Sequence, residues 1–193
     1  MKRNKWYKIL LKEAEMYLKK APKVSPVHKS DHLKRVWKRS EILCKSLNCD
    51  PDVMVAACLL HDLGRHHGLE IHGRKSAELA KPILERHNFP RDKIPKVLDA
   101  IAQHDYNFPP AERKSIESKI LYDADKMDAF GTVGIYRHLL FIEAGRIRMN
   151  EVIPLLEKRW TGLTLIESRK IAKEDYEYTV NFFKSLQKEL KEA

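Results

Sequence analysis

Histidines stand beside carboxylates at several points of this sequence, and these two residue types together bind divalent metal ions. The clearest pair is His61-Asp62, which directly follows the apolar run DVMVAACLL. An ionised aspartate at the end of a buried helix is costly unless it meets a cation or a full set of hydrogen-bond donors. A divalent ion would supply that cation, although a lone histidine on a helix is usually an ordinary polar group.

A second feature is the acidic segment YDADKMDAFG, which carries Asp123, Asp125 and Asp128. Carboxylates this close repel one another if they share a helix face without a cation. A metal ion would relieve that repulsion. The alternative is a solvent-facing acidic patch that Lys126 offsets, and the residues alone leave both interpretations open.

The elements that position these groups are predicted to be helices. Only seven glycines occur, long stretches consist of strong helix formers, and no alternating strand pattern is present. We expect Pro82 to kink its helix or mark a boundary, and a break near Gly131 and Gly134. The predicted helices cover about residues 4–20, a segment capped by Ser30 or Asp31, a buried segment opened by Asp50-Pro51 and ended by Gly64, and residues 76–87, 95–103, 116–145, 151–159 and 167–190. The predicted class is all-α.

Length and composition exclude several classes of protein. A chain of 193 residues with 43% hydrophobic residues can bury a core as one domain. It contains no apolar run of about 18 residues, so we expect no membrane helix. The cysteines, Cys44, Cys49 and Cys58, are odd in number and form no CxxC pair. This favours buried reduced thiols in a cytoplasmic protein. The net charge of +10 attracts either nucleic acid or a small phosphorylated anion.

The order of these residues matches a known signature. His32, then His61-Asp62, then Asp125 resembles the H…HD…D pattern of the HD superfamily of metal-dependent phosphohydrolases. The resemblance runs from about residue 30 to residue 138 and includes DHLKRV, LLHDLGR, HGRKSAELA, IAQHD and DADKMDAFGTVGIYR. It implies a single-domain HD-type helical bundle over residues 1–193 with the metal site at its centre. The motif core would span about residues 30–138, with helices in 151–190 packing on it.

The resemblance also implies the ligands. His32, His61, Asp62 and Asp125 would bind the metal, and Asp125 is chosen over Asp123 because the family ligand directly precedes a basic residue and then an apolar one. Two further groups of residues match the family context. They are His72 and His104, which would bind a second metal or the phosphate, and Asp123 and Asp128, which would orient ligands or position water.

The expected chemistry is metal-assisted attack of water on phosphorus. A set of imidazoles and carboxylates without thiolate favours one or two ions of Mn²⁺, Fe²⁺, Co²⁺, Ni²⁺ or Mg²⁺. Asp62 can accept the proton of the water. Cationic side chains would steady the phosphoryl group, with Arg65 and Lys126 as catalytic residues and Arg35 and Arg137 as phosphate-binding residues.

Departures from the family narrow the substrate. Guanosine-polyphosphate hydrolases carry an acidic pair where this chain has Arg65 and His66, and the GYP signature of cyclic-dinucleotide phosphodiesterases is absent. We therefore expect hydrolysis of a nucleotide or other small phosphorylated metabolite by a cytoplasmic monomer or homodimer. The alternatives are a phosphodiesterase acting on RNA or a cyclic nucleotide, and a basic nucleic-acid-binding module whose metal site is structural.

Overall fold

The structure is a computed structural model that describes residues 4–20, 30–67, 72–105, 108–109 and 112–192. Every regular element in these ranges is a helix, so the all-α prediction is confirmed. The elements are α1 (Lys5–Lys20), α2 (Ser30–Leu47), α3 (Pro51–Leu60), η1 (Leu63–His67), α4 (Gly73–Arg86), α5 (Ile94–Ala102), α6 (Ile116–Met127), α7 (Gly131–Glu143), η3 (Met149–Glu151), α8 (Val152–Thr161) and α9 (Ile166–Glu192).

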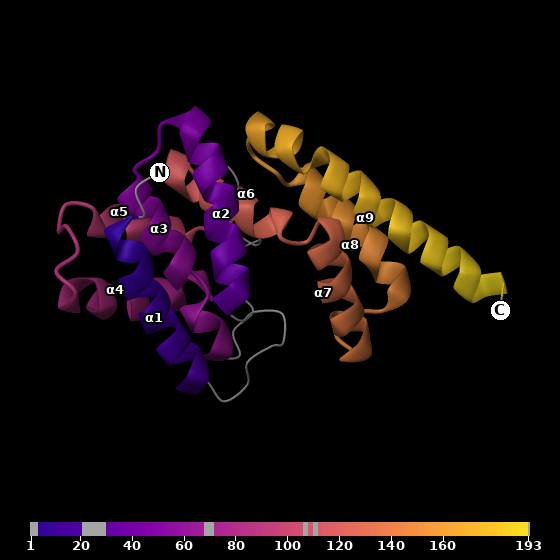
Figure 1. Cartoon of the computed structure of the whole chain (residues 1–193), viewed down its shortest axis with the longest axis horizontal. Helices are drawn as coiled ribbons and strands as arrows, with labels where there is room; N and C mark the ends of the chain where they lie inside the picture. The colour runs from indigo at the N-terminus through magenta and orange to yellow at the C-terminus, as the bar shows by residue number, and fades with distance from the viewer. Residues whose placement is uncertain (1–3, 21–29, 68–71, 106–107, 110–111, 193) are drawn as a thin grey trace. The chain divides into compact units, whose positions relative to one another are not determined.

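The chain divides into two compact units, Met1–Ala124 and Asp125–Ala193, and Figure 1 colours the ribbon by residue number. Each unit is described by itself below. The packing of residues 151–190 on the motif core therefore stays a prediction, as does the single domain.

Helix α3 lies at the core of the first unit. Each residue from 53 to 60 is fully buried, and the helix contacts α1, α2 and α5 (Figure 1). As predicted, Asp50 caps its first turn, because the Asp50 carboxylate accepts hydrogen bonds from the N–H groups of Asp52 and Val53. Burying each large aliphatic side chain contributes about 1.5–3 kcal/mol, which fixes this helix firmly. The residues that follow it are consequently carried into the interior.

Gly64 does not end α3 as predicted. The helix ends at Leu60, and Gly64 lies within the short helix η1. A Cβ atom at Gly64 would lie 2.6 Å from the carbonyl oxygen of His72 and 2.7 Å from the amide nitrogen of Ser76. The Gly64 N–H also donates to Ser76 Oγ at 2.9 Å. Glycine is needed here because η1 and the start of α4 approach each other closely.

Other helix boundaries also differ from the prediction. Helix α4 begins at Gly73 and continues through Pro82, so this proline does not end it. The predicted segment 116–145 breaks into α6 and α7, as expected, at Gly131, whose φ is +75°. Gly134 lies inside α7, where a Cβ atom would collide with the carbonyl of Ala129.

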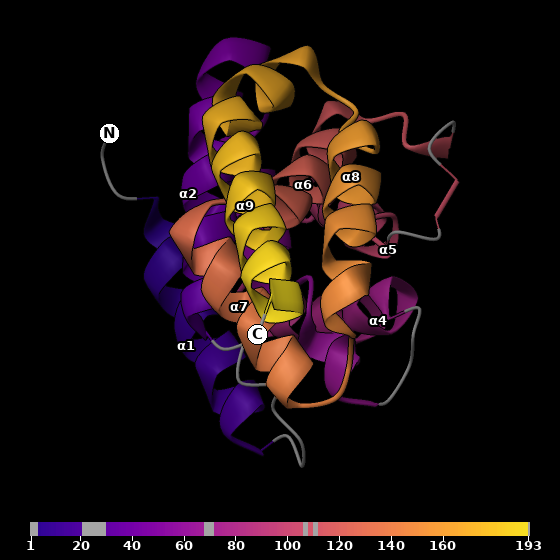
Figure 2. The same cartoon turned by 90° about the vertical axis from the view of Figure 1, so that its right-hand side faces the viewer.

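The second unit is built on α7, α8 and α9, and Figure 2 shows α8 and α9 running side by side. The Gly131 N–H donates to Thr179 Oγ1 at 2.7 Å, which fixes the start of α7 on α9. Trp160 of α8 stacks on Tyr176 of α9 with ring centroids 4.5 Å apart. Apolar and aromatic contacts of this kind hold the three helices together.

The cysteines correct one prediction. Cys44 and Cys49 form a disulfide, whereas reduced thiols were expected. Asn48 takes a φ of +48° after the end of α2 and turns the chain back. The turn brings the two Cα atoms to 5.2 Å, a separation that a disulfide spans. Cys58 is a buried thiol outside this disulfide, as predicted, with its Sγ atom 3.1 Å from Ser40 Oγ.

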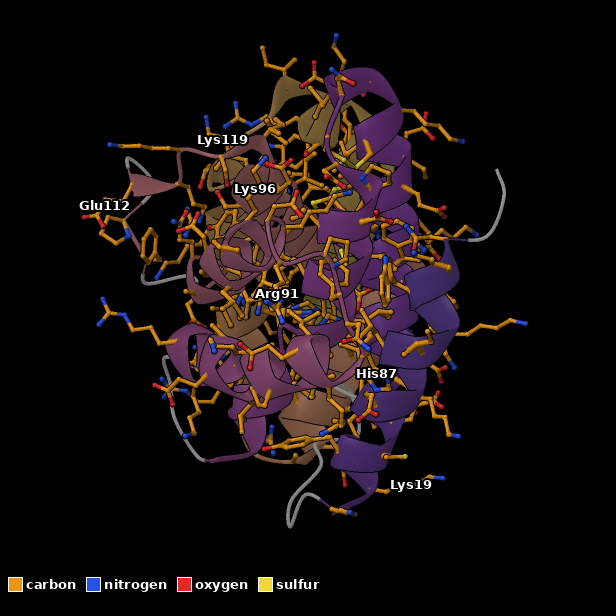
Figure 3. All side chains as sticks on the ribbon, turned by 90° about the vertical axis from the view of Figure 1, so that its left-hand side faces the viewer. Lys19, His87, Arg91, Lys96, Glu112 and Lys119 are labelled. Carbon is orange, nitrogen blue, oxygen red and sulfur yellow. A yellow bond between two sulfur atoms is a disulfide. The ribbon has the colours of Figure 1, made fainter. Side chains whose placement is uncertain are left out.

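Charged side chains cover the outside of the first unit, as Figure 3 shows for Lys19, Lys96 and Lys119. At the end of α4, His87 Nε2 lies 2.7 Å from Glu13 Oε1 of α1. Among the described helices, none is both long enough and apolar enough to cross a membrane. Localisation to the cytoplasm stays a prediction.

Candidate metal centre

His61 and Asp62 follow the last turn of α3, and both are buried, with exposures of 0% and 4%. His61 Nδ1 lies 2.9 Å from the carbonyl oxygen of Cys58, three residues earlier. A carbonyl oxygen only accepts hydrogen bonds, so Nδ1 carries the proton. The other ring nitrogen, Nε2, then faces Asp62 Oδ1 at 3.6 Å.

His104 repeats this arrangement at the end of α5. Its Nδ1 atom lies 2.6 Å from the carbonyl oxygen of Ile101, again three residues earlier. The two sites correspond to the two histidine–aspartate pairs of the sequence, His61-Asp62 and His104-Asp105. His104 Nε2 lies 3.8 Å from Asp62 Oδ1, so both rings present the same nitrogen to one carboxylate.

His72 precedes α4 and completes this side of the cluster. Its Nε2 atom lies 2.9 Å from Asp62 Oδ1 and 3.0 Å from His104 Nε2. Its Nδ1 atom lies 3.0 Å from Asp105 Oδ1, and Asp105 Oδ2 accepts the N–H of Gly73 at 2.6 Å. Burial raises the pKa of Asp105, but His72 and His104 outweigh it and lower that pKa to about 2. Burial lowers the pKa of His72, but hydrogen bonds with Asp105 and Asp62 outweigh it and raise that pKa to about 9.

His32 of α2 lies on the other side of Asp62. Its Nε2 atom is 3.5 Å from Asp62 Oδ2, and its exposure is 1%. Asp62 is thus shared by two groups of possible ligands in the described part of the chain, namely His32, His61 and Asp62, and Asp62, His72 and His104. Within each group the ligand atoms lie within 4.8 Å of one another.

The chemistry of this donor set fits a metal ion. His61 and His104 carry a proton on Nδ1, so a neutral ring of either residue would turn the lone pair of Nε2 toward the carboxylate of Asp62. Each of these contacts becomes favourable only with a second proton on the ring or with a cation beside the two atoms. His72 and His104 cannot both be protonated at Nε2, because these atoms are 3.0 Å apart. Within the described residues, Asp62 Oδ2 is buried and accepts no hydrogen bond. One or two divalent cations, bound by the two groups that share Asp62, would satisfy these atoms.

The charge of Asp62 follows from the same surroundings. Burial favours the neutral carboxyl and by itself would raise the pKa of Asp62. The charge of His61, the charge of Arg65 and hydrogen bonds from nearby rings outweigh burial and hold that pKa well below its usual range. Asp62 is therefore ionised, which is the form in which a carboxylate binds metals.

Three further predicted residues, Arg65, Asp123 and Arg35, belong to the first unit. Arg65 Nε lies 3.4 Å from Asp62 Oδ1, and its side chain is 37% exposed, so one end of the cluster carries a cation that solvent reaches. Asp123 is fully buried in α6. Arg35 is half-buried on α2, three residues after His32.

The remaining predicted residues belong to the second unit. Asp125 is half-buried and forms an ion pair with Lys126, whose Nζ atom lies 2.6 Å from Asp125 Oδ2. Asp128 and Arg137 are both buried and form an ion pair with each other. The assignment of these four residues to the metal or the phosphate stays a prediction.

Sequence reasoning missed Asp105, which fixes the ring of His72 and the start of α4. The signal was present, because Asp105 follows His104 as Asp62 follows His61. It also missed the two carbonyl groups that orient His61 and His104, since backbone groups leave no mark in a residue pattern.

The helical fold and the buried histidine–aspartate cluster define a class, the HD-superfamily hydrolases. The model of the HD domain matches residues 30–129, which is more than half of the chain. The protein therefore belongs to the HD domain family.

Solved structures agree with this assignment. A predicted HD superfamily hydrolase from an uncultured Thermotogales bacterium is 26% identical, with a TM-score of 0.72 over 98% of this chain and 96% of that one. An HD-superfamily hydrolase from Bacillus thuringiensis is 22% identical, with a TM-score of 0.71 over 96% of each chain. Bacillus subtilis YpgQ, solved in complex with ADP, is 19% identical, with a TM-score of 0.69 over 95% of this chain and 97% of that one. The comparison with curated proteins found no match.

Proposed function

We propose that this protein is a divalent-metal-dependent phosphohydrolase that acts on a nucleotide or another small phosphorylated metabolite. The observation that carries the proposal is the buried carboxylate of Asp62, which belongs to two groups of possible ligands, one with His32 and His61 and one with His72 and His104. A hydrolase of the HD superfamily needs a metal at this place, and this donor set suits one.

His32, His61, Asp62 and, from its motif, Asp125 are the proposed metal ligands. His72 and His104 would hold a second ion or contact the phosphate. Imidazole and carboxylate donors without thiolate favour Mn²⁺, Fe²⁺, Co²⁺, Ni²⁺ or Mg²⁺. When bound, such an ion supplies Lewis acidity and lowers the pKa of a bound water toward neutrality.

The protein's own residues supply the remaining functions. Asp62 is ionised and can accept a proton from the attacking water. Arg65 lies beside this carboxylate and is partly exposed, so it can contact a phosphoryl oxygen and offset its charge. We assign Lys126 a catalytic role of the same kind. We assign Arg35 and Arg137 to phosphate binding, and Asp123 and Asp128 to orientation of ligands or water.

Two observations support a small phosphorylated substrate. The net charge of +10 attracts anions. YpgQ, which shares the fold, was solved with ADP, a nucleoside diphosphate. A nucleoside phosphate is therefore the first substrate class to assay.

The experiment is a hydrolysis screen with Mn²⁺, Co²⁺, Ni²⁺, Fe²⁺ and Mg²⁺ against nucleotides, cyclic nucleotides, short RNA and an aryl phosphate. We expect metal-dependent release of phosphate from the nucleotides, and its loss in Asp62→Asn. Asp92→Asn, an exposed aspartate of the same unit, is the matched control and should keep the activity.

The screen also separates the alternatives. Cleavage confined to RNA or cyclic nucleotides would identify a phosphodiesterase. Absence of hydrolysis with every metal, together with binding to nucleic acid that weakens steeply with salt, would identify a nucleic-acid-binding module.

A further inference from the structure

Arg113 is a buried cation that the proposed reaction does not use. It precedes α6, and its exposure is 1%. Its Nε atom donates to the carbonyl oxygen of Gln103 at 2.8 Å, and its Nη2 atom donates to those of Asp105 and Phe108 at 2.9 Å each. One side chain thus holds the backbone at three positions of a single segment.

The burial of this guanidinium is supported by its surroundings. Its central carbon lies 3.7 Å from the ring centroid of Tyr122, a cation–π contact. Burial lowers the pKa of Arg113, while Tyr122 and the carboxylates of Asp123 and Asp105 oppose that shift. A buried charge is expensive, and here three carbonyl acceptors and the ring of Tyr122 offset that cost.

The segment that Arg113 holds contains His104 and Asp105. The carbonyls that it binds belong to the residues immediately before and after His104, so the backbone of His104 is fixed on both sides. Asp105 in turn contacts His72 Nδ1 at 3.0 Å. Displacement of this segment would therefore move His104 directly and would move His72 through Asp105.

We propose that Arg113 is a positioning residue that sets the orientation of His104 and, through Asp105, of His72 for metal binding. The inference rests on the proposed function, because it takes the cluster to be a metal site. Lysine cannot replace arginine here, since a single ammonium cannot reach three carbonyls with the geometry of the guanidinium fork. Loss of groups that orient metal ligands typically weakens metal affinity about 10- to 100-fold.

The first measurement is the affinity of metal-free protein for Mn²⁺ by isothermal titration calorimetry. We expect Arg113→Lys to bind Mn²⁺ about 10- to 100-fold more weakly than the wild type. Arg86→Lys is the control, because Arg86 is exposed and pairs with Glu13, a contact that lysine can keep. Unchanged affinity in folded Arg113→Lys would overturn the inference. Absence of Mn²⁺ binding by the wild type would instead overturn the proposed function.

A second measurement needs no metal. Ring ¹⁵N NMR spectra of the metal-free protein, assigned with His104→Gln, report which nitrogen of His104 carries the proton. The wild type should show the Nδ1–H form, held by the Ile101 carbonyl, and Arg113→Lys should show a mixture of forms. The same form at the same fraction in both proteins would refute the positioning role, whatever the metal result.

Two more variants test the route and guard against misfolding. If Arg113 acts through Asp105, the double variant Arg113→Lys/Asp105→Asn should lose less Mn²⁺ affinity than the two single losses combined. Fully additive losses would contradict that route. Should Arg113→Lys fail to fold, Tyr122→Leu removes the ring beneath the guanidinium and should weaken Mn²⁺ binding to a smaller extent. Wild-type affinity in Tyr122→Leu would then count against the inference.

Discussion

His138, in the second unit, should make the stability of that unit sensitive to acid. The ring is 2% exposed, and its Nδ1 atom donates to the carbonyl oxygen of Gly134 at 2.7 Å. Its Nε2 atom faces Arg159 Nη1 at 3.3 Å, so a proton added there would meet a guanidinium. Burial, and then the charge of Arg159, lower the pKa of His138 from 6.5 to about 4.

The magnitude follows from proton linkage. The unfolded chain binds a proton at His138 below its unfolded pKa of 6.5, whereas the folded unit resists protonation until about pH 4. The stabilisation is therefore complete above the unfolded pKa and declines as the pH falls toward the folded one. Between about pH 7.5 and pH 5, linkage predicts a loss of about 2 kcal/mol in the free energy of unfolding.

The assay is urea unfolding at the two pH values, monitored through the fluorescence of Trp160. Trp6 and Trp37 are replaced by phenylalanine so that Trp160 is the only source of tryptophan fluorescence. Trp160 stacks on Tyr176 and so reports on the second unit. The parent protein here carries both tryptophan replacements. His138→Gln in this parent cannot be protonated at position 138, so its free energy of unfolding should fall by about 2 kcal/mol less than that of the parent between these pH values. Tyr136→Gln, at an exposed position of the same helix, should keep the parent's dependence. Equal pH dependence of the parent and His138→Gln would refute the reasoning.

Three further predictions concern stability in the first unit. Gly64→Ala places a methyl group against the backbone at the start of α4 and should lower the free energy of unfolding by about 1–3 kcal/mol in urea titrations. An unchanged free energy of unfolding would show that η1 does not approach α4 tightly. Asp50→Ala removes the cap of α3 and should cost about 1 kcal/mol, measured in the same way, and a neutral effect would argue against the cap. The Cys44→Ser/Cys49→Ser variant should have a free energy of unfolding about 2 kcal/mol lower than the oxidised protein, which is the value expected for closing so short a loop. In the presence of a reductant, the variant and the wild type should have the same free energy of unfolding. A difference that persists in reductant would mean that the disulfide is not its source.

Local sequence patterns were sufficient to predict the elements that bury the cluster. The residues from Val53 to Leu60 are apolar on every side, and Asp50-Pro51 opens their helix in the way that caps usually do. Both signals arise from residues that are close together in the sequence, so recognising the helix that they predict does not require knowledge of tertiary contacts. The break at Gly131 was predictable for the same reason, because a positive φ favours glycine.

Features that depend on tertiary approach were not predictable in this way. Gly64 looked like a helix end, but the structure shows that it makes room for α4. The disulfide depends on the turn at Asn48, which brings Cys49 back to Cys44, and the number of cysteines does not reveal such a turn. The burial of Arg113 depends on tertiary structure in the same way, because the carbonyls that surround it come together only in the fold.

The central claim is that Asp62 is the shared ligand of a divalent metal centre. The most direct measurement is Mn²⁺ binding by isothermal titration calorimetry to metal-free wild type, Asp62→Asn and the control Asp92→Asn. We predict that the wild type and the control bind Mn²⁺ alike, and that Asp62→Asn loses binding at both groups of histidines because each includes Asp62. Binding of Mn²⁺ by Asp62→Asn with the affinity and stoichiometry of the wild type would contradict the claim.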